Sequence, residues 1–103
     1  MERIARIQEM LVSNPADSFL RHALALEYIK QGSDAEARSL FEAVLLDAPG
    51  YVGSYYHLGK LLERAGEAEE AVRCYERGME QARLKGEQHA LNELRAAWEE
   101  LTL

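Results

Sequence analysis

Residues 15–48 read PADSFLRHALALEYIKQGSDAEARSLFEAVLLDA, and residues 49–82 read PGYVGSYYHLGKLLERAGEAEEAVRCYERGMEQA. The second stretch repeats the first at an offset of 34 residues. Prolines, glycines and alanines recur at this offset, and these residue types set where a backbone turns and how closely helices approach. The identical pairs include Pro15 and Pro49, Leu24 and Leu58, Gly32 and Gly66, Glu36 and Glu70, Ala37 and Ala71, Glu42 and Glu76, and Ala48 and Ala82.

A repeat of this length is a supersecondary unit that cannot bury its hydrophobic face alone. Such units stack on one another, and stacking leaves an extended concave surface that other molecules can occupy. The repeat therefore predicts a binding scaffold, and it gives no indication of what is bound.

Each copy of the repeat reads as two helices separated by a glycine. In the first copy, apolar residues recur at helical spacing before and after Gly32, which can adopt the left-handed conformation that ends a helix. Asp17 or Ser18 can cap the first helix, and Ser33 or Asp34 can cap the second. We therefore expect helices over about 17–31 and 34–47.

The second copy predicts helices over about 51–65 and 68–85. No proline follows Ala82, so the latter helix is expected to run on to Gly86, with Gly78 as an internal weak point of roughly 1 kcal/mol relative to alanine. An amphipathic helix is expected over 2–12 and another over about 87–101. On the last helix one stripe is apolar and comprises Leu91, Leu94, Trp98 and Leu101.

The composition is that of a soluble globular protein, with 48% hydrophobic and 29% charged residues. A net charge of -6 argues against a nucleic-acid partner, because phosphate binding needs a clustered basic face. No apolar run approaches the length that spans a bilayer, and no signal peptide is evident, so we expect no membrane partner and a cytoplasmic location. The lone Cys74 cannot form an internal disulfide.

The repeat resembles the tetratricopeptide repeat, whose signature is an aromatic, a leucine-glycine pair and a tyrosine on the first helix, then an alanine and an aromatic on the second, and a closing proline. Arg21 departs from this signature, and the second repeat lacks the closing proline. In the first repeat the signature positions hold Arg21, Leu24, Ala25, Tyr28, Ala37, Phe41 and Pro49, and in the second Tyr55, Leu58, Gly59, Leu62, Ala71 and Tyr75.

The resemblance implies an all-α fold, a right-handed α-solenoid of antiparallel helix pairs with about six helices. We expect one domain over 1–103. It would comprise an opening half-repeat (1–14), two repeats (15–48 and 49–85) and a C-terminal capping helix (86–103). Alanine or glycine at 25 and 59 is small where the two helices of a pair must approach closely.

The resemblance also implies that a peptide or a partner helix binds along a concave groove lined mainly by the first helix of each pair. Leu26 and Ile29 are open to a second interpretation, in which they face the core. The expected groove residues are Phe19, His22, Leu26, Ile29 and Lys30 from the first repeat, Tyr56, His57, Lys60, Glu63 and Arg64 from the second, and His89, Asn92, Glu93 and Ala96 from the closing helix.

Some members of the family hold a C-terminal carboxylate between lysine, arginine and asparagine side chains in this groove. The corresponding positions here hold leucine, glutamate and histidine, so such a clamp is not predicted. Lys60 and Arg64, one turn apart, could still hold an acidic group.

Neither an enzyme nor a metal or cofactor site is predicted. The three histidines come from three helices and share no local ligand spacing, and the chain has no phosphate loop, nucleophile elbow or HExxH motif. Cys74 is expected to be a half-buried structural thiol, and Trp98 to anchor the last helix on the second repeat.

Two functions follow from the sequence. The first is an adaptor or scaffold that binds a protein or peptide partner in the groove. The alternative is a structural module that self-associates, as a homodimer or larger assembly, through its terminal helices.

Overall fold

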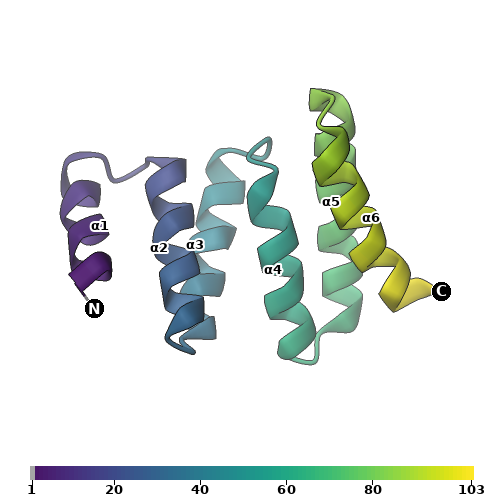
Figure 1. Cartoon of the computed structure of the whole chain (residues 1–103), viewed down its shortest axis with the longest axis horizontal. Coiled ribbons are helices and arrows are strands. Elements are labelled where there is room, and N and C mark those ends of the chain that lie inside the picture. The colour runs from purple at the N-terminus through teal and green to yellow at the C-terminus, as the bar shows by residue number, and fades with distance from the viewer. Residues whose placement is uncertain (1) are drawn as a thin grey trace. The chain divides into compact units, whose positions relative to one another are not determined.

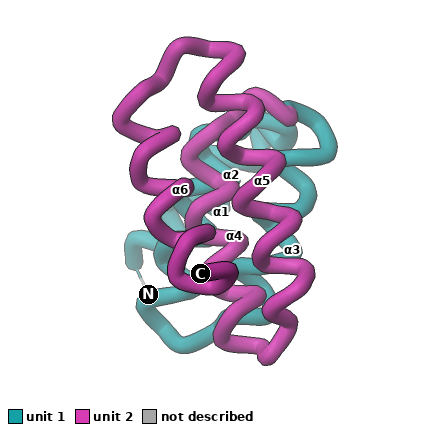
Figure 2. The backbone as a smooth tube through the Cα atoms, turned by 90° about the vertical axis from the view of Figure 1, so that its right-hand side faces the viewer, with its two compact units in different colours: residues 1–48 teal, residues 49–103 magenta. Residues whose placement is uncertain are grey.

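The computed structural model describes residues 2–103, and every regular element in that range is a helix. The helices are α1 (Glu2–Ser13), α2 (Ser18–Lys30), α3 (Asp34–Asp47), α4 (Gly53–Arg64), α5 (Ala68–Lys85) and α6 (Gln88–Thr102) (Figure 1). They fall into two compact units, residues 1–48 and 49–103, which Figure 2 shows in different colours. The boundary between the units is the point at which the second repeat begins.

In unit 1, α2 and α3 form an antiparallel pair and α1 packs against α2. The backbone amide of Leu20 donates a hydrogen bond of 2.9 Å to the Asp17 carboxylate, which identifies Asp17 as the N-cap of α2. Gly32 has a φ of 78°, so the predicted left-handed turn between the helices is confirmed. Ser33 occupies the N-cap position of α3, but its side chain makes no capping hydrogen bond, and that expected cap is absent.

The core of unit 1 joins α1 to the pair. Ile4 and Ile7 of α1 are buried with Leu24 of α2, as the apolar spacing of the opening helix predicts. The partly buried residues packed on this cluster are Leu11, Leu20, Ala23, Tyr28 and Leu40.

In unit 2, α4 and α5 form the second antiparallel pair and α6 packs against both of them. The helix α4 begins at Gly53, two residues later than predicted, so Tyr51 precedes it. The helix α5 has 18 residues where α3 has 14, and it ends at Gly86 with a φ of 70°. The prediction that α5 runs on in the absence of a proline is therefore confirmed.

Two glycines of unit 2 lie where helices approach closely. A Cβ atom on Gly59 would lie 2.2 Å from Cε1 of Tyr75, a side chain that is fully buried. A Cβ atom on Gly78 would lie 2.6 Å from Cβ of Tyr55 and 3.0 Å from Cδ1 of Leu94. Gly78, expected to be a weak point of α5, is thus also the residue that lets α5 approach its neighbours.

In each repeat, a buried side chain of the first helix donates a hydrogen bond to the segment before that helix. The type of side chain differs between the two repeats. In unit 2 the Tyr55 hydroxyl donates a hydrogen bond of 2.6 Å to the Pro49 carbonyl oxygen. In unit 1 Arg21 stands at the equivalent position, and its Nη2 donates a bond of 3.2 Å to the Ala16 carbonyl oxygen. Arg21 is buried, and its Nη1 lies 3.1 Å from Oδ2 of Asp47 on α3. The residue that departs from the family signature therefore makes a comparable contact.

The last helix is anchored on α5. Leu94 and Ala97 are buried, and Trp98 donates a hydrogen bond of 3.0 Å from its Nε1 to Oε2 of Glu76, so the predicted anchor is confirmed. Cys74 of α5 is fully buried rather than half-buried, because it lies in the close interface with α4, where its thiol is 3.4 Å from the Tyr55 carbonyl oxygen.

Candidate functional site

The residues predicted to bind a partner lie on α2 in unit 1 and on α4 and α6 in unit 2. We call the α2 set (Phe19, His22, Leu26, Ile29 and Lys30) the α2 surface. We call the α4 set (Tyr56, His57, Lys60, Glu63 and Arg64) the α4 surface. Because these residues belong to separate compact units, each surface is described by itself.

The α2 surface begins with an exposed aromatic side chain. Phe19, in the first turn of α2, is 67% exposed, although phenylalanine is usually buried. Leu26 and Ile29, farther along the helix, are half-buried, which fits both interpretations offered by the sequence. His22 is half-buried, and its ring meets Phe41 of α3 edge to face at a centroid distance of 5.3 Å. His22 thus supports the helix pair as well as facing outward.

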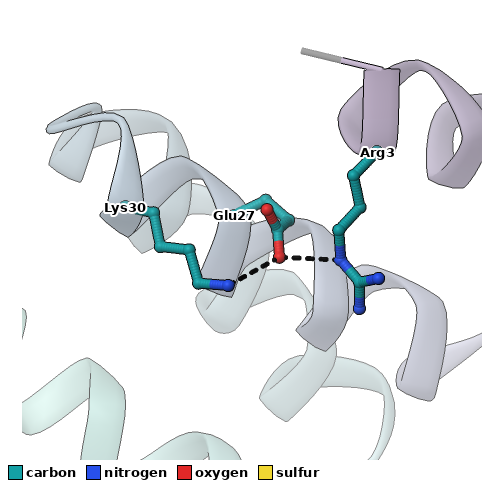
Figure 3. A network of polar contacts seen from close by, with 3 residues as sticks. All are labelled: Arg3, Glu27 and Lys30. Atoms are coloured by element: carbon teal, nitrogen blue, oxygen red, sulfur yellow. Dashed lines mark hydrogen bonds and ion pairs between the residues drawn. The ribbon is translucent and has the colours of Figure 1, made fainter.

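Lys30 at the end of α2 is part of an ion-pair network. Its Nζ lies 3.2 Å from Oε2 of Glu27, and Nε of Arg3 on α1 lies 2.9 Å from the same oxygen (Figure 3). Burial by itself would raise the pKa of Glu27, but the hydrogen bonds and charges of Lys30 and Arg3 bring it below its usual value. Lys30 is therefore already engaged by a carboxylate of its own unit.

The α4 surface combines aromatic rings with charges. The rings of Tyr56 and His57 meet at a centroid distance of 5.6 Å and an angle of 86°. The ammonium of Lys60, one turn after Tyr56, lies 5.6 Å from the centroid of the Tyr56 ring, within the range of a cation–π interaction. These three residues form a half-buried strip along α4.

Two carboxylates flank the Lys60 ammonium. Its Nζ is 3.6 Å from Oε2 of Glu63 and 3.9 Å from Oε1 of Glu100 on α6. The same Glu63 oxygen accepts a short hydrogen bond from the hydroxyl of Tyr75. Burial and this bond to Glu63 raise the pKa of Tyr75 well above its usual value. Glu63 is thus held by its hydrogen bond to the buried Tyr75, and the same carboxylate lies close to Lys60.

The remaining predicted residues of unit 2 lie on α6 and at the end of α4. His89 and Asn92 of α6 are exposed, and Asn92 accepts a hydrogen bond of 2.8 Å from Gln88. Arg64 is exposed in the last turn of α4. Burial lowers the pKa of His57, although the charge of Glu93 on α6 opposes the shift.

Sequence reasoning missed Glu100 as part of this face. Glu93 and Glu100 are seven residues apart, close to two helical turns, so they share one side of α6. That spacing was a usable signal, but it does not say which side of α6 meets α4. The contact with Lys60 depends on how α6 packs, and only the structure provides that.

Within residues 2–103, no group of three or more histidine, cysteine, aspartate or glutamate side chains could hold a metal ion. No helix in the same range has the length and apolar character needed to cross a membrane.

The family model described as tetratricopeptide repeat matches residues 28–97. A crystal structure of a tetratricopeptide repeat domain protein from Salinibacter ruber is 44% identical, with a TM-score of 0.80, and the match covers 82% of this chain and 94% of that one. A solution structure of a protein from Bordetella parapertussis is 26% identical, with a TM-score of 0.81, over 95% of this chain and 85% of that one. None of the curated proteins compared with the chain matches it.

These similarities agree with the helices described above. The fold class predicted from the sequence, an all-α solenoid of antiparallel helix pairs, is confirmed by the six helices of residues 2–103 and by the related structures.

Proposed function

Because the chain belongs to the tetratricopeptide repeat family, we propose that it is an adaptor whose α2 surface and α4 surface each bind an extended segment or a helix of a partner protein. Domains of this family generally bind protein partners and are generally non-catalytic scaffolds. The identity of the contact residues in this chain is our own proposal, and each unit contributes its own set.

The exposure of the Phe19 side chain is the observation that carries the proposal. Its side chain lies on the first helix of a pair and is 67% exposed, whereas Phe41 on the second helix is fully buried. An exposed phenylalanine is available to fill an apolar pocket of a partner, and buried aromatic anchors supply much of the energy of protein interfaces. The α4 surface adds the Tyr56 ring and the charges around it.

The charges of the α4 surface bear on the kind of partner. The sequence suggested that Lys60 and Arg64 could hold an acidic group. Lys60 already lies between Glu63 and Glu100, so an acidic ligand would have to displace two carboxylates of the protein itself. A strongly acidic partner is therefore disfavoured at this position.

The test is capture of partners from native lysate, analysed by mass spectrometry, with wild type, Phe19→Ala and Leu46→Ala. Leu46 is the matched control, because it is a large apolar side chain of unit 1 that is 83% exposed but lies on the second helix of its pair. We expect Phe19→Ala to lose a partner that wild type and Leu46→Ala both retain, with the melting temperatures of all three proteins within a few degrees. Equal capture by all three proteins would remove the α2 surface from the proposal.

Self-association is the second candidate, favoured by Met10 and Val12, which are 48% and 81% exposed on α1. A second copy could cover these side chains. Light scattering would then find a dimer or larger assembly for wild type and a monomer for Val12→Asp. A monomeric wild type across the accessible concentration range would contradict this candidate.

The non-catalytic role and the cytoplasmic location expected from the sequence remain part of the proposal. An enzymatic role would require a pocket with perturbed titratable groups arranged for chemistry.

A further inference from the structure

In unit 2, an aromatic ring and two carboxylates of α4 and α6 surround the ammonium of Lys60. The Tyr56 ring forms one wall, and the carboxylates of Glu63 and Glu100 stand beside it; we call these three residues the cradle. Lys60 occupies the cradle, with its ammonium 5.6 Å from the ring centroid and 3.6 and 3.9 Å from the two carboxylates. These three residues thus surround the position of a positive charge.

Lys60 satisfies neither the hydrogen bonding nor the charge of the cradle completely. Both of its distances to carboxylate oxygens exceed those of a good hydrogen bond, so it supplies charge without donating a close bond to either group. The cradle contains two carboxylates and Lys60 brings one positive charge, so one negative charge is left over. The Glu100 side chain is 76% exposed and free to rotate toward a ligand, while Glu63 is held by Tyr75.

A guanidinium group meets these requirements better than an ammonium. It is planar, can stack on an aromatic face, and can donate two parallel hydrogen bonds to a carboxylate. The lysine side chain is flexible and its ammonium is strongly hydrated, so Lys60 can move into solvent when another cation arrives.

We propose that the cradle binds an arginine side chain of the partner, which stacks on Tyr56 and pairs with Glu63 and Glu100 in the place that Lys60 occupies in the free protein. The proposal rests on the proposed function, because it names the chemistry of the partner at the α4 surface. It reverses the charge preference suggested by the lysine and arginine of α4 in the sequence.

The direct test is an NMR titration of the full chain with Nα-acetyl-arginine amide, and with Nα-acetyl-citrulline amide as the neutral analogue of the same shape. We expect arginine amide to bind weakly and to shift the resonances of Tyr56, Lys60, Glu63 and Glu100, and citrulline amide to leave them in place. Added salt should weaken the binding, because the charges are partly exposed. Equal shifts from both probes, or shifts spread over the whole chain, would overturn the proposal.

Matched variants locate the binding. Glu100→Gln should weaken the affinity for arginine amide about two- to fivefold, the range expected when one exposed ion pair is lost. Glu99→Gln removes the neighbouring carboxylate of the same helix, which is no part of the cradle, and should have no effect. Lys60→Ala should strengthen binding by removing the internal competitor, whereas Lys85→Ala, which removes the same charge from α5, should not. If the paired variants behave alike, general charge attraction explains the binding and the cradle does not.

The partner-capture experiment separates this proposal from the adaptor function. A partner lost on Phe19→Ala but retained by Glu63→Gln/Glu100→Gln would leave the adaptor function standing and refute the arginine anchor. Loss of the partner in both, with the Glu99→Gln variant still binding, supports both proposals.

Discussion

Substitution of Gly59 by alanine tests the close approach of α4 and α5. The added Cβ would lie 2.2 Å from Cε1, 2.6 Å from Cζ and 2.8 Å from Cδ1 of Tyr75. The ring would have to move by about 1 Å to reach ordinary van der Waals contact near 3.4 Å. Tyr75 is fully buried and hydrogen-bonded to Glu63, so such a movement must displace other core side chains or break that bond.

The expected loss of stability follows from three contributions. Overpacking of a core costs about 1–3 kcal/mol. Loss of the hydrogen bond to the charged Glu63 costs about 1.5–3 kcal/mol, and alanine regains about 1 kcal/mol of helix propensity over glycine. Together these contributions predict that Gly59→Ala lowers the free energy of unfolding by about 1.5–5 kcal/mol. For a domain of this size the melting temperature should fall by at least about 6 °C.

The assay is urea unfolding followed by far-ultraviolet circular dichroism. Gly50→Ala is the control, because its Cβ would lie 3.6 Å from the flexible end of Lys85, and it should change stability by less than about 0.5 kcal/mol. A Gly59→Ala variant as stable as wild type, or more stable, would refute the packing of Tyr75 on Gly59, since helix propensity alone favours alanine.

Three further predictions concern the core and the segments before the helices. Ala71→Leu should cost about 1–3 kcal/mol by overpacking a fully buried site, whereas Ala68→Leu on the exposed side of α5 should be nearly neutral in thermal melts. Arg21→Ala should lower the free energy of unfolding by about 2 kcal/mol, chiefly through lost packing. Arg21→Tyr should recover part of this loss by making the contact that Tyr55 makes in the other repeat. Equal stability of the two variants would contradict this prediction. Burial raises the pKa of both Tyr55 and Tyr75 above the usual 10.0, so their neutral forms are favoured in the folded state. The stability that these two tyrosines contribute should therefore be constant below about pH 10 and fall as the pH rises further, because the unfolded chain releases these protons first. Urea unfolding at a series of alkaline pH values checks this, and Tyr75→Phe should reduce the slope.

The ends of α2, α4 and α5 were predictable because these helices end at glycines that can be recognised in the sequence itself. Gly32 and Gly66 have φ values of 78° and 80°, and the longer α5 ends where the sequence places Gly86. The start of α4 was less predictable, because the N-cap position is held by Val52, whose side chain cannot accept a capping hydrogen bond.

The candidate site was less accessible from the sequence than the fold. Which residues lie on the first helices follows from helical spacing, but the ion pairs that they form depend on contacts between distant parts of the chain. Lys60 and Glu100 are brought together by the packing of α6 on α4, and Arg3 reaches Glu27 from α1. Arg21 appeared only as a departure from the family signature, and its contact with Asp47 became visible when α3 was placed beside α2.

The most direct test of the account is the affinity of a captured partner for the purified chain, measured by calorimetry with wild type, Phe19→Ala and Leu46→Ala. The account predicts that Phe19→Ala raises the dissociation constant at least tenfold, a loss of about 1.4 kcal/mol of binding free energy. Leu46→Ala should bind as wild type does. All three proteins should melt within a few degrees of one another, because both side chains are exposed. Equal dissociation constants for the three proteins, or a loss confined to Leu46→Ala, would contradict the claim that the first helix of the pair binds the partner.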